Sequence, residues 1–573
     1  MDLSYYELRA FLYPREKEHT ATFKLSDIEQ TWFCTQKNVK RKLKKFEEAG
    51  YFRYIPGRGR GNPSQIIFQK SFQDELDETI RQLVKEEQMD ELMQLLQLPI
   101  PRSWIANISN EVQTLFGLQS QNESKDVLRS IVTRELTTLE PTKTSITFES
   151  YLIQQFGDCL VSYDKHVDEI KPHLAHHWVV DEDFMTWRFY LRKGVRFHHQ
   201  QIMTAEDVKY TFERFTKDSP FYWLIKDIEQ IECLSSFIVQ FKLKESNPFF
   251  LRYLSAHNLA VLPKDVEFDE NEWIGTGPFK LKERSDKKIV LEAFDQYFLE
   301  RALLDHIEFW KVPTPAVNQV SFQVEGVEEE NGIQEKEEVE VGFRFLAFNF
   351  NRRSVVDDAS FREAMYHILD IKKMYRELER EEPIEASGYF HWNSEQRVRN
   401  LSKVESLLKR SGYQGETLTL ISLNYPKAIE EGEWFVEQAR KFNVHIVIKP
   451  CLIDVLYSRE IEQQADMMFM GEVASNDYHL SFLGAFYNEA LAFRRFLAVE
   501  HLEQIDQWLE CFKREKRADD REEWICQIEN YIRAHNLFLY LTHPVKRRTF
   551  HPMIQDIQFV SFGNVDLRKL WIQ

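Results

Sequence analysis

Residues 35–68 read TQKNVKRKLKKFEEAGYFRYIPGRGRGNPSQIIF, and the order of patterns in this stretch decides the fold of the N-terminal part of the chain. Val39, Leu43 and Phe46 recur at the spacing of one helical face, and Gly50 follows as a typical end of a helix. Two short segments rich in aromatic and β-branched residues come next, separated by a loop of glycine and arginine. The stretch therefore predicts a helix followed by a β-hairpin.

Two shorter amphipathic segments come before this stretch. The first, residues 5–13, ends at Pro14, and the second offers Ser26 as a helix N-cap with Glu29 three residues later. Two short helices, a third helix over residues 35–49 and a hairpin are the elements of a winged helix-turn-helix, in that order.

The predicted third helix is cationic on the face opposite its apolar residues. Residues 35–60 carry a net charge of +7, which leaves −25 on the rest of a chain whose total is −18. In a winged helix the third helix enters the major groove of DNA and the hairpin tip lies along the backbone or minor groove. The residues that we expect to contact double-stranded DNA are Gln36, Lys37, Lys40, Arg41, Lys44, Lys45, Arg58 and Arg60.

A nucleotide-binding loop is the rival interpretation of the glycines at 57–61. Their spacing is G-x-G-x-G rather than G-x-G-x-x-G, Pro56 interrupts the approach, and a strand rather than a helix follows. No helix N-terminus is then available to receive a phosphate, so we favour the tip of a wing.

The rest of the chain is too long for one core and alternates strand-like and helical segments. An amphipathic helix over 72–98 and the polar segment 119–126 read as a connector and a linker. We expect three parts: a winged-helix domain at 1–72, a helical connector and linker at 73–126, and a large mixed α/β module at 127–573. Thr204 is the expected N-cap of a helix inside that module.

Several phrases of the module resemble the bacterial extracellular solute-binding proteins of family 5, the oligopeptide- and nickel-binding type. They are LRKGVRFHHQQIMTAEDVKYTFERF (191–215), GTGPFKL (275–281), LAFNFNRRSVVDDASFREAMYHILD (346–370), EASGYF (385–390), LLKRSGYQGETLTL (407–420) and ADMMFMGEV (465–473). The resemblance covers roughly residues 128–573. It implies a two-lobed, periplasmic-binding-protein-like fold of type II around a deep cleft. Lobe one is then expected at about 127–320 and 500–573, and lobe two at about 341–499, with a solvated, glutamate-rich loop at 324–341.

A winged helix in front of such a module resembles the SgrR-type transcriptional regulators. The N-terminus lacks the pattern of a signal peptide, and the sequence contains no stretch of about 18 uncharged apolar residues. The six cysteines have no C-x-x-C spacing, which argues against a zinc cluster or a disulfide framework. We therefore expect a bacterial protein of the cytoplasm that does not interact with a membrane.

The family resemblance also implies candidate ligand-binding residues. In oligopeptide binders an acidic residue near a W-x-A-D-Y-x-D-P phrase holds the amino terminus of the peptide. Here the matching stretch is GEVASNDYHL, without the tryptophan and the D-P pair, and Glu472 or Asp477 would take that role. Asn349 and Tyr389 lie in segments that approach the cleft in the family, so we expect these four residues to contact ligand.

Histidines in HLAHHW (173–178) and at His198 and His199 raise the question of a metal. His173 and His177 stand at i, i+4, but no carboxylate or cysteine lies close to them in the sequence, so we expect surface histidines and neither a metal nor a cofactor. A catalytic motif such as G-x-S-x-G or H-E-x-x-H is also absent, and we do not expect an enzyme.

These observations predict a transcriptional regulator that binds DNA through its winged helix and senses a small molecule or peptide in the interlobe cleft. Ligand binding would change the position of the head or the assembly of a homodimer. Two alternatives stay open: an intracellular solute- or peptide-binding protein without specific DNA regulation, and a metal-dependent hydrolase built on the histidines.

Overall fold

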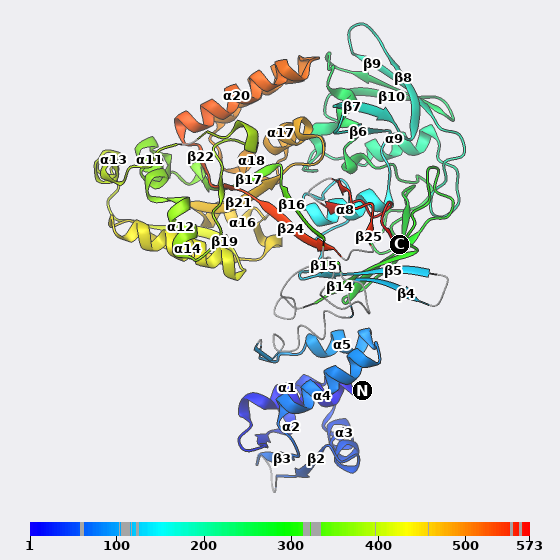
Figure 1. Cartoon of the computed structure of the whole chain (residues 1–573), viewed down its shortest axis with the longest axis vertical. Helices are drawn as coiled ribbons and strands as arrows, with labels where there is room; N and C mark the ends of the chain where they lie inside the picture. Colours follow the sequence, from blue (N-terminus) through cyan, green and yellow to red (C-terminus); the bar gives the residue numbers. More distant parts are fainter. Residues whose placement is uncertain are drawn as a thin grey trace.

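A computed structural model describes the chain over residues 1–57, 62–101, 103–104, 115, 117–121, 125–312, 321–322, 334–395, 397–456, 458–550, 554–560 and 564–572. A small N-terminal head lies at one end of the long axis, and a larger two-lobed module lies at the other (Figure 1). Both are mixed α/β, as predicted.

The head is a winged helix. Its elements are α1 (Leu3–Leu12), β1 (Thr20–Phe23), α2 (Leu25–Thr31), α3 (Gln36–Glu48), β2 (Phe52–Ile55) and β3 (Ser64–Phe68), followed by α4 (Phe72–Lys85) and α5 (Met89–Leu96). The three strands form an antiparallel sheet in the order β1-β3-β2. Val39, Leu43 and Phe46 are buried under α3, so the predicted apolar face is confirmed.

Two local predictions in the head are wrong by a few residues. The second helix begins at Leu25, so its N-cap is Lys24 rather than Ser26, and the carboxylate of Asp27 accepts the backbone N–H of Lys24. The single helix expected over 72–98 is broken between α4 and α5, where Glu87 adopts a left-handed backbone with φ of 51°.

Lobe one contains two antiparallel or mixed sheets and the helix α8 (Thr147–Phe156). The five-stranded sheet has the order β12 (Phe279–Arg284), β13 (Lys288–Ala293), β14 (His306–Lys311), β5 (Lys125–Val132), β4 (Gly117–Gln121). The four-stranded sheet has the order β10 (Ile228–Ser235), β11 (Ile238–Leu243), β9 (Thr186–Leu191), β8 (Ala175–Val180). The ribbon β6 (Val161–Asp164) and β7 (Glu169–Pro172) and the helices α9 (Ala205–Glu213) and α10 (Phe250–Tyr253) complete it.

Lobe two is built on a five-stranded sheet in the order β20 (His445–Cys451), β19 (Thr417–Leu423), β21 (Met467–Val473), β17 (Gly342–Phe348), β22 (Phe538–Tyr540). Its helices are α11 (Ala359–Ile368), α12 (Ile371–Glu377), α13 (Val404–Ser411), α14 (Pro426–Arg440), α15 (Ile453–Leu456), α16 (Glu460–Gln464), α17 (Tyr478–Tyr487), α18 (Ala492–Phe496), α19 (Val499–Arg514) and α20 (Ala518–His535). Since β22 pairs with β17, the chain leaves lobe two later than the expected residue 500.

The chain crosses between the lobes through a strand pair. β16 (Gln334–Val339) runs antiparallel to β24 (Val545–Phe550), and β15 (Ser321–Phe322) pairs with the far end of β24. Part of the glutamate-rich segment predicted as a loop is therefore a strand, because β24 supplies cations opposite its carboxylates, as in the 2.8 Å ion pair between Glu337 and Arg547.

The polar segment 119–126 also differs from its prediction as a linker. Its described residues lie in the hairpin of β4 and β5, at the edge of the lobe-one sheet. Hydrogen-bonding to β14 holds β5 there, in parallel register from Val127 opposite His306 to Val132 opposite Lys311.

The head packs against lobe one rather than hanging from a flexible tether. Trp310 and Val312 of lobe one belong to the same buried apolar cluster as the residues of α4 and α5. Asp90 of α5 lies 3.9 Å from Lys287 and 3.8 Å from Lys288, and Lys288 also stands over the ring of Trp310. The head and lobe one therefore share one core and a rim of ion pairs.

In the part of the chain that the structure describes, no helix has the length and apolar composition needed to cross a membrane.

Candidate DNA-binding surface and interlobe cavity

The helix α3 lies at the end of the head that points away from the module (Figure 1), and its cationic side chains are exposed to solvent. The six predicted contact residues on this helix are all exposed: Gln36, Lys37, Lys40, Arg41, Lys44 and Lys45. The apolar side of α3 packs on the sheet and on α1, so the opposite side of the helix faces solvent. Lys42 differs from the other cations of the helix, because it turns inward and contacts Ser4 and the ring of Trp32.

Three of these six side chains have partners on the protein surface. Lys44 pairs with Glu48 at 3.6 Å, Lys45 with Asp2 at 3.3 Å, and Gln36 donates to Glu29. Pairs this exposed are weak and exchange readily for another anion such as a phosphate. Lys37, Lys40 and Arg41 are exposed on the same side of the helix.

The predicted contacts Arg58 and Arg60 lie outside the described residues. The strands that lead to them are described, and Ile55 pairs with Gln65 at the last rung before the loop. Gly57 sits where an added Cβ would meet the backbone oxygen of Asn62 at 2.4 Å, so only glycine fits this entrance to the loop.

Sequence reasoning missed Phe33 as a surface residue. It lies in the turn between α2 and α3, its backbone is left-handed with φ of 45°, and its side chain is 97% exposed. The sequence suggests that an aromatic residue next to Trp32 is buried, and only the strained turn directs Phe33 outward.

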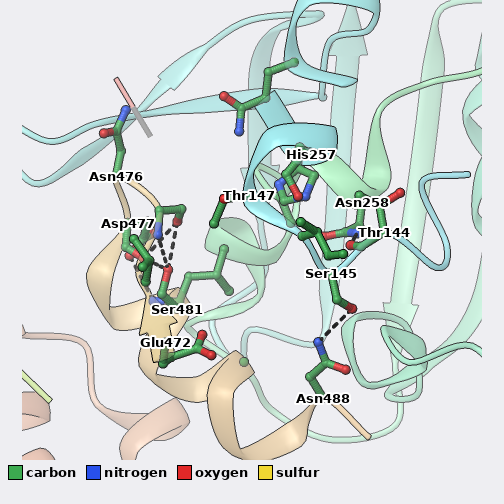
Figure 2. A pocket seen from close by; sticks show the side chains of 18 of the residues that line it. Thr144, Ser145, Thr147, His257, Asn258, Glu472, Asn476, Asp477, Ser481 and Asn488 are labelled. Carbon is green, nitrogen blue, oxygen red and sulfur yellow. Dashed lines mark hydrogen bonds between the residues drawn. The ribbon is translucent and has the colours of Figure 1, made fainter. Parts of the chain in front are cut away.

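A cavity of about 590 Å³ lies between the two lobes. Its lobe-one wall comes from the segment before α8, the start of α8 and residues 255–258, and its lobe-two wall comes from the end of β21 and from α17. Figure 2 shows Thr144, Ser145 and Asn258 on one side and Glu472, Asp477 and Ser481 on the other. This volume is typical of sites for small ligands.

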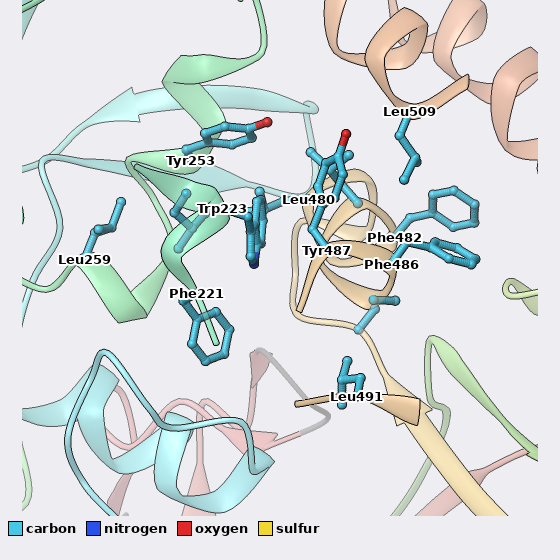
Figure 3. Close-up of a cluster of buried hydrophobic side chains, with 14 of the residues drawn as sticks. Phe221, Trp223, Tyr253, Leu259, Leu480, Phe482, Phe486, Tyr487, Leu491 and Leu509 are labelled. Atoms are coloured by element: carbon cyan, nitrogen blue, oxygen red, sulfur yellow. The ribbon is translucent and has the colours of Figure 1, made fainter. Parts of the chain in front are cut away.

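An apolar cluster joins the lobes beside the cavity (Figure 3). Trp223 of lobe one lies 5.9 Å from the ring of Tyr487 on α17, and an added Cβ on Gly484 would meet Trp223 at 3.2 Å. Phe249 and Phe512 form a second aromatic contact across the lobes, at 5.4 Å. The lobes are therefore packed together around the cavity in this structure.

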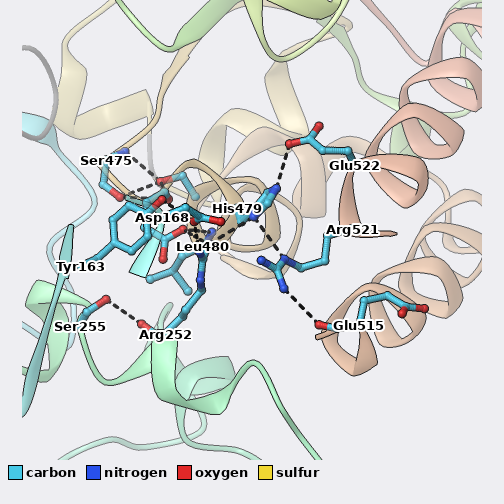
Figure 4. Close-up of polar contacts among 12 residues, drawn as sticks. Tyr163, Asp168, Arg252, Ser255, Ser475, His479, Leu480, Glu515, Arg521 and Glu522 are labelled. Carbon is cyan, nitrogen blue, oxygen red and sulfur yellow. Dashed lines mark hydrogen bonds and ion pairs between the residues drawn. The ribbon is translucent and has the colours of Figure 1, made fainter. Parts of the chain in front are cut away.

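A polar network also bridges the lobes, centred on Arg252 of α10 (Figure 4). Its guanidinium donates to Asp477 of lobe two at 2.9 Å and is ion-paired with Asp168 of lobe one. It also lies 3.2 Å from His479 Nδ1, and the other ring nitrogen of His479 meets Glu522 at 2.9 Å. Burial lowers the pKa of His479, so the ring is neutral and its Nδ1 accepts from Arg252.

Asp477 was predicted as a ligand contact, and the structure gives it two internal roles. Its carboxylate caps α17 through the backbone N–H of Leu480 and pairs with Arg252. Burial raises the pKa of this carboxyl, and Arg252 opposes that effect. Asp477 lines the cavity, but its carboxylate already forms an ion pair with Arg252.

Two histidines that were expected at the surface are half-buried in lobe one. His173 contacts Asp158 at 2.7 Å on the cavity wall, where Tyr297 and Thr276 also donate to Asp158. Burial lowers the pKa of His198 to about 4, and its ring bonds to backbone groups of the 275–277 turn. The residues that contact these two histidines are distant from them in the sequence, so no local sequence pattern indicates that the histidines are partly buried.

Glu472, at the end of β21, points into the cavity (Figure 2). Burial raises the pKa of its carboxyl to about 8.

Asn349 and Tyr389, by contrast, do not line the cavity. The amide of Asn349 is buried and donates to the carbonyls of Glu462 and Ala465, and Tyr389 packs between Phe343 and Phe482. The structure thus brings two of the four predicted ligand residues to the cavity.

Among the described residues, no group of three or more histidine, cysteine, aspartate and glutamate side chains could hold a metal ion.

Both the large module and the N-terminal head match models of known protein families. Residues 169–492, more than half of the chain, match the family model described as bacterial extracellular solute-binding proteins, family 5, middle. The chain belongs to this family. Residues 4–117 match a second model, the N-terminal domain of the sugar transport-related sRNA regulator SgrR, so this family 5 chain is of the SgrR type.

Individual relatives agree with this assignment. The uncharacterized protein YhjP of Bacillus subtilis (strain 168) is 29% identical over 479 residues, which are 81% of each chain. The HTH-type transcriptional regulator SgrR of Yersinia pestis (strain Pestoides F) is 24% identical over 344 residues, and the alignment spans 59% of this chain and 60% of that regulator.

Solved structures share the fold of the family 5 module. The dipeptide-binding protein of Pseudoalteromonas sp. SM9913, in complex with Met-Leu, has a TM-score of 0.67 at 19% identity and covers 78% of this chain and 100% of its own. NikA from Brucella suis, in complex with Fe(III)-EDTA, has a TM-score of 0.65 at 18% identity, with the same coverage.

Proposed function

We propose that this protein is a transcriptional regulator whose winged helix binds double-stranded DNA and whose interlobe cavity binds a small solute or peptide. The observation that carries the proposal is the exposed cationic side of α3, a helix that lies at the end of the head remote from the module and fits entry into a major groove. The regulators named SgrR among its relatives, and the peptide in a structural neighbour, support the two halves of the proposal. A binding fold of this kind indicates a role without catalysis.

The alternative is a solute-binding protein whose basic head only attaches to acidic partners. Selection from a pool of random duplexes at physiological salt separates the two functions. We expect the full-length protein to enrich a shared sequence and to protect it in a footprint. Retention of DNA without any enriched sequence would contradict the regulator and support the alternative, because phosphate contacts alone carry no sequence information.

The joint between head and lobe one determines how a ligand acts on DNA binding. Since the two share one core, ligand-driven movement of lobe two shifts it relative to lobe one and head together. The ligand then alters DNA affinity by changing where lobe two sits in the complex or in a homodimer on the operator. Reciprocity requires that operator DNA change the ligand affinity by the same factor.

Replacing Trp310 by alanine should loosen this joint. Trp310 is buried, donates to Glu308 at 2.8 Å and carries Lys288 over its ring. Removing a buried tryptophan typically costs about 3–5 kcal/mol. We therefore expect amide hydrogens of α5 to exchange at least ~10-fold faster, since 1.4 kcal/mol already corresponds to tenfold. Trp571→Ala, at a side chain that is 40% exposed, is the control. Unchanged exchange in α5 of the Trp310 variant would show that the joint does not depend on this contact.

A further inference from the structure

Phe33 occupies a position in the head that usually belongs to glycine. The helix α2 ends in a turn that is closed by a hydrogen bond from the backbone N–H of Cys34 to the carbonyl of Glu29, at 3.2 Å. In a helix ending of this type the residue before the closing N–H is left-handed, and glycine is preferred because it has no Cβ. Phe33 is that residue, with φ of 45°. A bulky side chain is unfavourable in this conformation, so the turn is strained.

The packing of the turn does not explain why a phenylalanine stands there. Trp32 holds the turn in place, because its indole N–H donates to the carbonyl of Ser4 at 3.0 Å and the ammonium of Lys42 lies 4.9 Å from its ring. The side chain of Phe33, in contrast, is 97% exposed. Glycine would satisfy the fold with less strain, and strain of this kind persists where a residue serves a function.

The surroundings of Phe33 fit DNA better than a protein partner. A protein interface draws on a contiguous apolar patch. The other large apolar side chains that are exposed in the described part of residues 1–104 are Met1, at 47%, and Ile55, at 38%. The segment that follows Phe33 carries a net charge of +7 between residues 35 and 60. A surface dominated by cations fits the phosphates of a duplex.

Phe33 also lies directly before the helix that enters the major groove. In a helix-turn-helix the first residues of the second helix contact the base edges. Here α3 begins at Gln36, three residues after Phe33, and both Gln36 and Lys37 are exposed. Thymine is the base that presents a methyl group in the major groove, and this group accepts apolar contacts from side chains such as phenylalanine.

We propose that Phe33 contacts the C5 methyl group of a thymine in the DNA site, so that the head prefers thymine at that position. This inference rests on the proposed DNA binding and adds a determinant of specificity to it. The strained turn is explained by the contact that its side chain makes in the complex.

Deoxyuridine in place of thymine tests the contact, because the replacement removes only the methyl group. Each thymine of the duplex selected by the full-length protein is replaced in turn, and the affinity is measured by fluorescence anisotropy. We expect one replacement, or a symmetric pair in a palindrome, to weaken binding about fourfold per site, the effect of removing one buried methyl group. Phe33→Gly should weaken binding to the unmodified duplex and should no longer respond to that replacement.

The stability of the same variant separates a contact with DNA from a structural role. Glycine relieves the left-handed backbone, so amide hydrogens of α2 and α3 in Phe33→Gly should exchange no faster than in the unmodified protein. Exchange that is at least ~10-fold faster would assign Phe33 a structural role and contradict the proposal.

His19→Gly is the matched control for the change of backbone. His19 is exposed and left-handed, with φ of 61°. It precedes the end of β1 that pairs with Ile67, whereas the other end of β1 pairs with Ser64, beside the loop of the wing. This variant should keep both the affinity and the preference for thymine.

The outcomes distinguish this inference from the proposed function. A selected sequence without thymine, equal affinity for every deoxyuridine duplex, or an unchanged response in Phe33→Gly would overturn the thymine contact alone. Selection that enriches no shared sequence would contradict the regulator and, with it, any base contact by Phe33.

Discussion

Replacing Arg252 by methionine should lower the free energy of unfolding of the two-lobed module by about 3–5 kcal/mol, the usual cost of removing one partner from a buried ion pair. Methionine fills similar space but leaves the carboxylate of Asp477 buried without its cation. The side chain of Asp477 is only 3% exposed, so water cannot replace the lost partner.

The loss should be concentrated at the contact between the lobes. Arg252 links Asp168 of lobe one to Asp477 and His479 of lobe two, so its removal weakens the contact between the two lobes. We expect the single unfolding transition of the module to move to lower denaturant concentration, or to split into two steps.

Denaturant unfolding followed by circular dichroism measures this effect, and two further variants make it interpretable. Arg301→Met removes an arginine that pairs with Asp295 and Asp305 at the surface and should cost less than about 1 kcal/mol. Arg252→Met combined with Asp477→Asn should recover part of the loss, since asparagine still caps α17 but no longer carries a charge. A loss in Arg252→Met no larger than in Arg301→Met would contradict the role of Arg252 as a buried bridge.

Replacing Lys37, Lys40 and Arg41 together by alanine should weaken operator binding by about 3 kcal/mol or more, at least ~100-fold. These three side chains are exposed on the cationic side of α3, and each lost contact to a base or phosphate removes about 1–3 kcal/mol. The slope of log affinity against log salt should also fall, by about 0.9 for every phosphate contact that is lost.

A matched triple variant separates a local contact from the general charge of the head. Lys17, Lys70 and Lys85 are exposed on other surfaces of the head, and their replacement by alanine removes the same charge. We expect a much smaller change in affinity and salt dependence from this variant, measured by fluorescence anisotropy on the selected duplex. Similar losses in both variants would mean that α3 is not the surface that reads DNA.

The sequence predicted the features that follow from local spacing. Helical periodicity placed Val39, Leu43 and Phe46 on the buried face of α3, and Thr204 caps α9 as expected, together with Asp207. The order of phrases indicated family 5, which the family comparison confirms. Predictions that depended on what a segment packs against were less successful, as the polar segment 119–126 and the glutamate-rich run before β17 both turned out to contain strands.

The candidate ligand residues also depended on tertiary contacts that the sequence does not contain. Asn349 and Tyr389 lie in the expected segments, but both side chains are buried in the core, and Asn349 directly follows β17 of the lobe-two sheet. Thr144, Ser145 and Asn258 carry no motif and were not predicted, because only the fold brings the segment before α8 to face α17.

By itself the sequence determined the winged helix, its cationic face and the family of the module, because side-chain direction within a helix or strand repeats with the backbone and can be read from spacing. Only the tertiary structure decided which charges in the cavity are compensated. Asp477 is neutralised by Arg252, 225 positions away, while Glu472, five positions from Asp477, has no partner among the described residues. Ion pairing and desolvation depend on distances in space between residues that are remote in sequence, so no local pattern contains them.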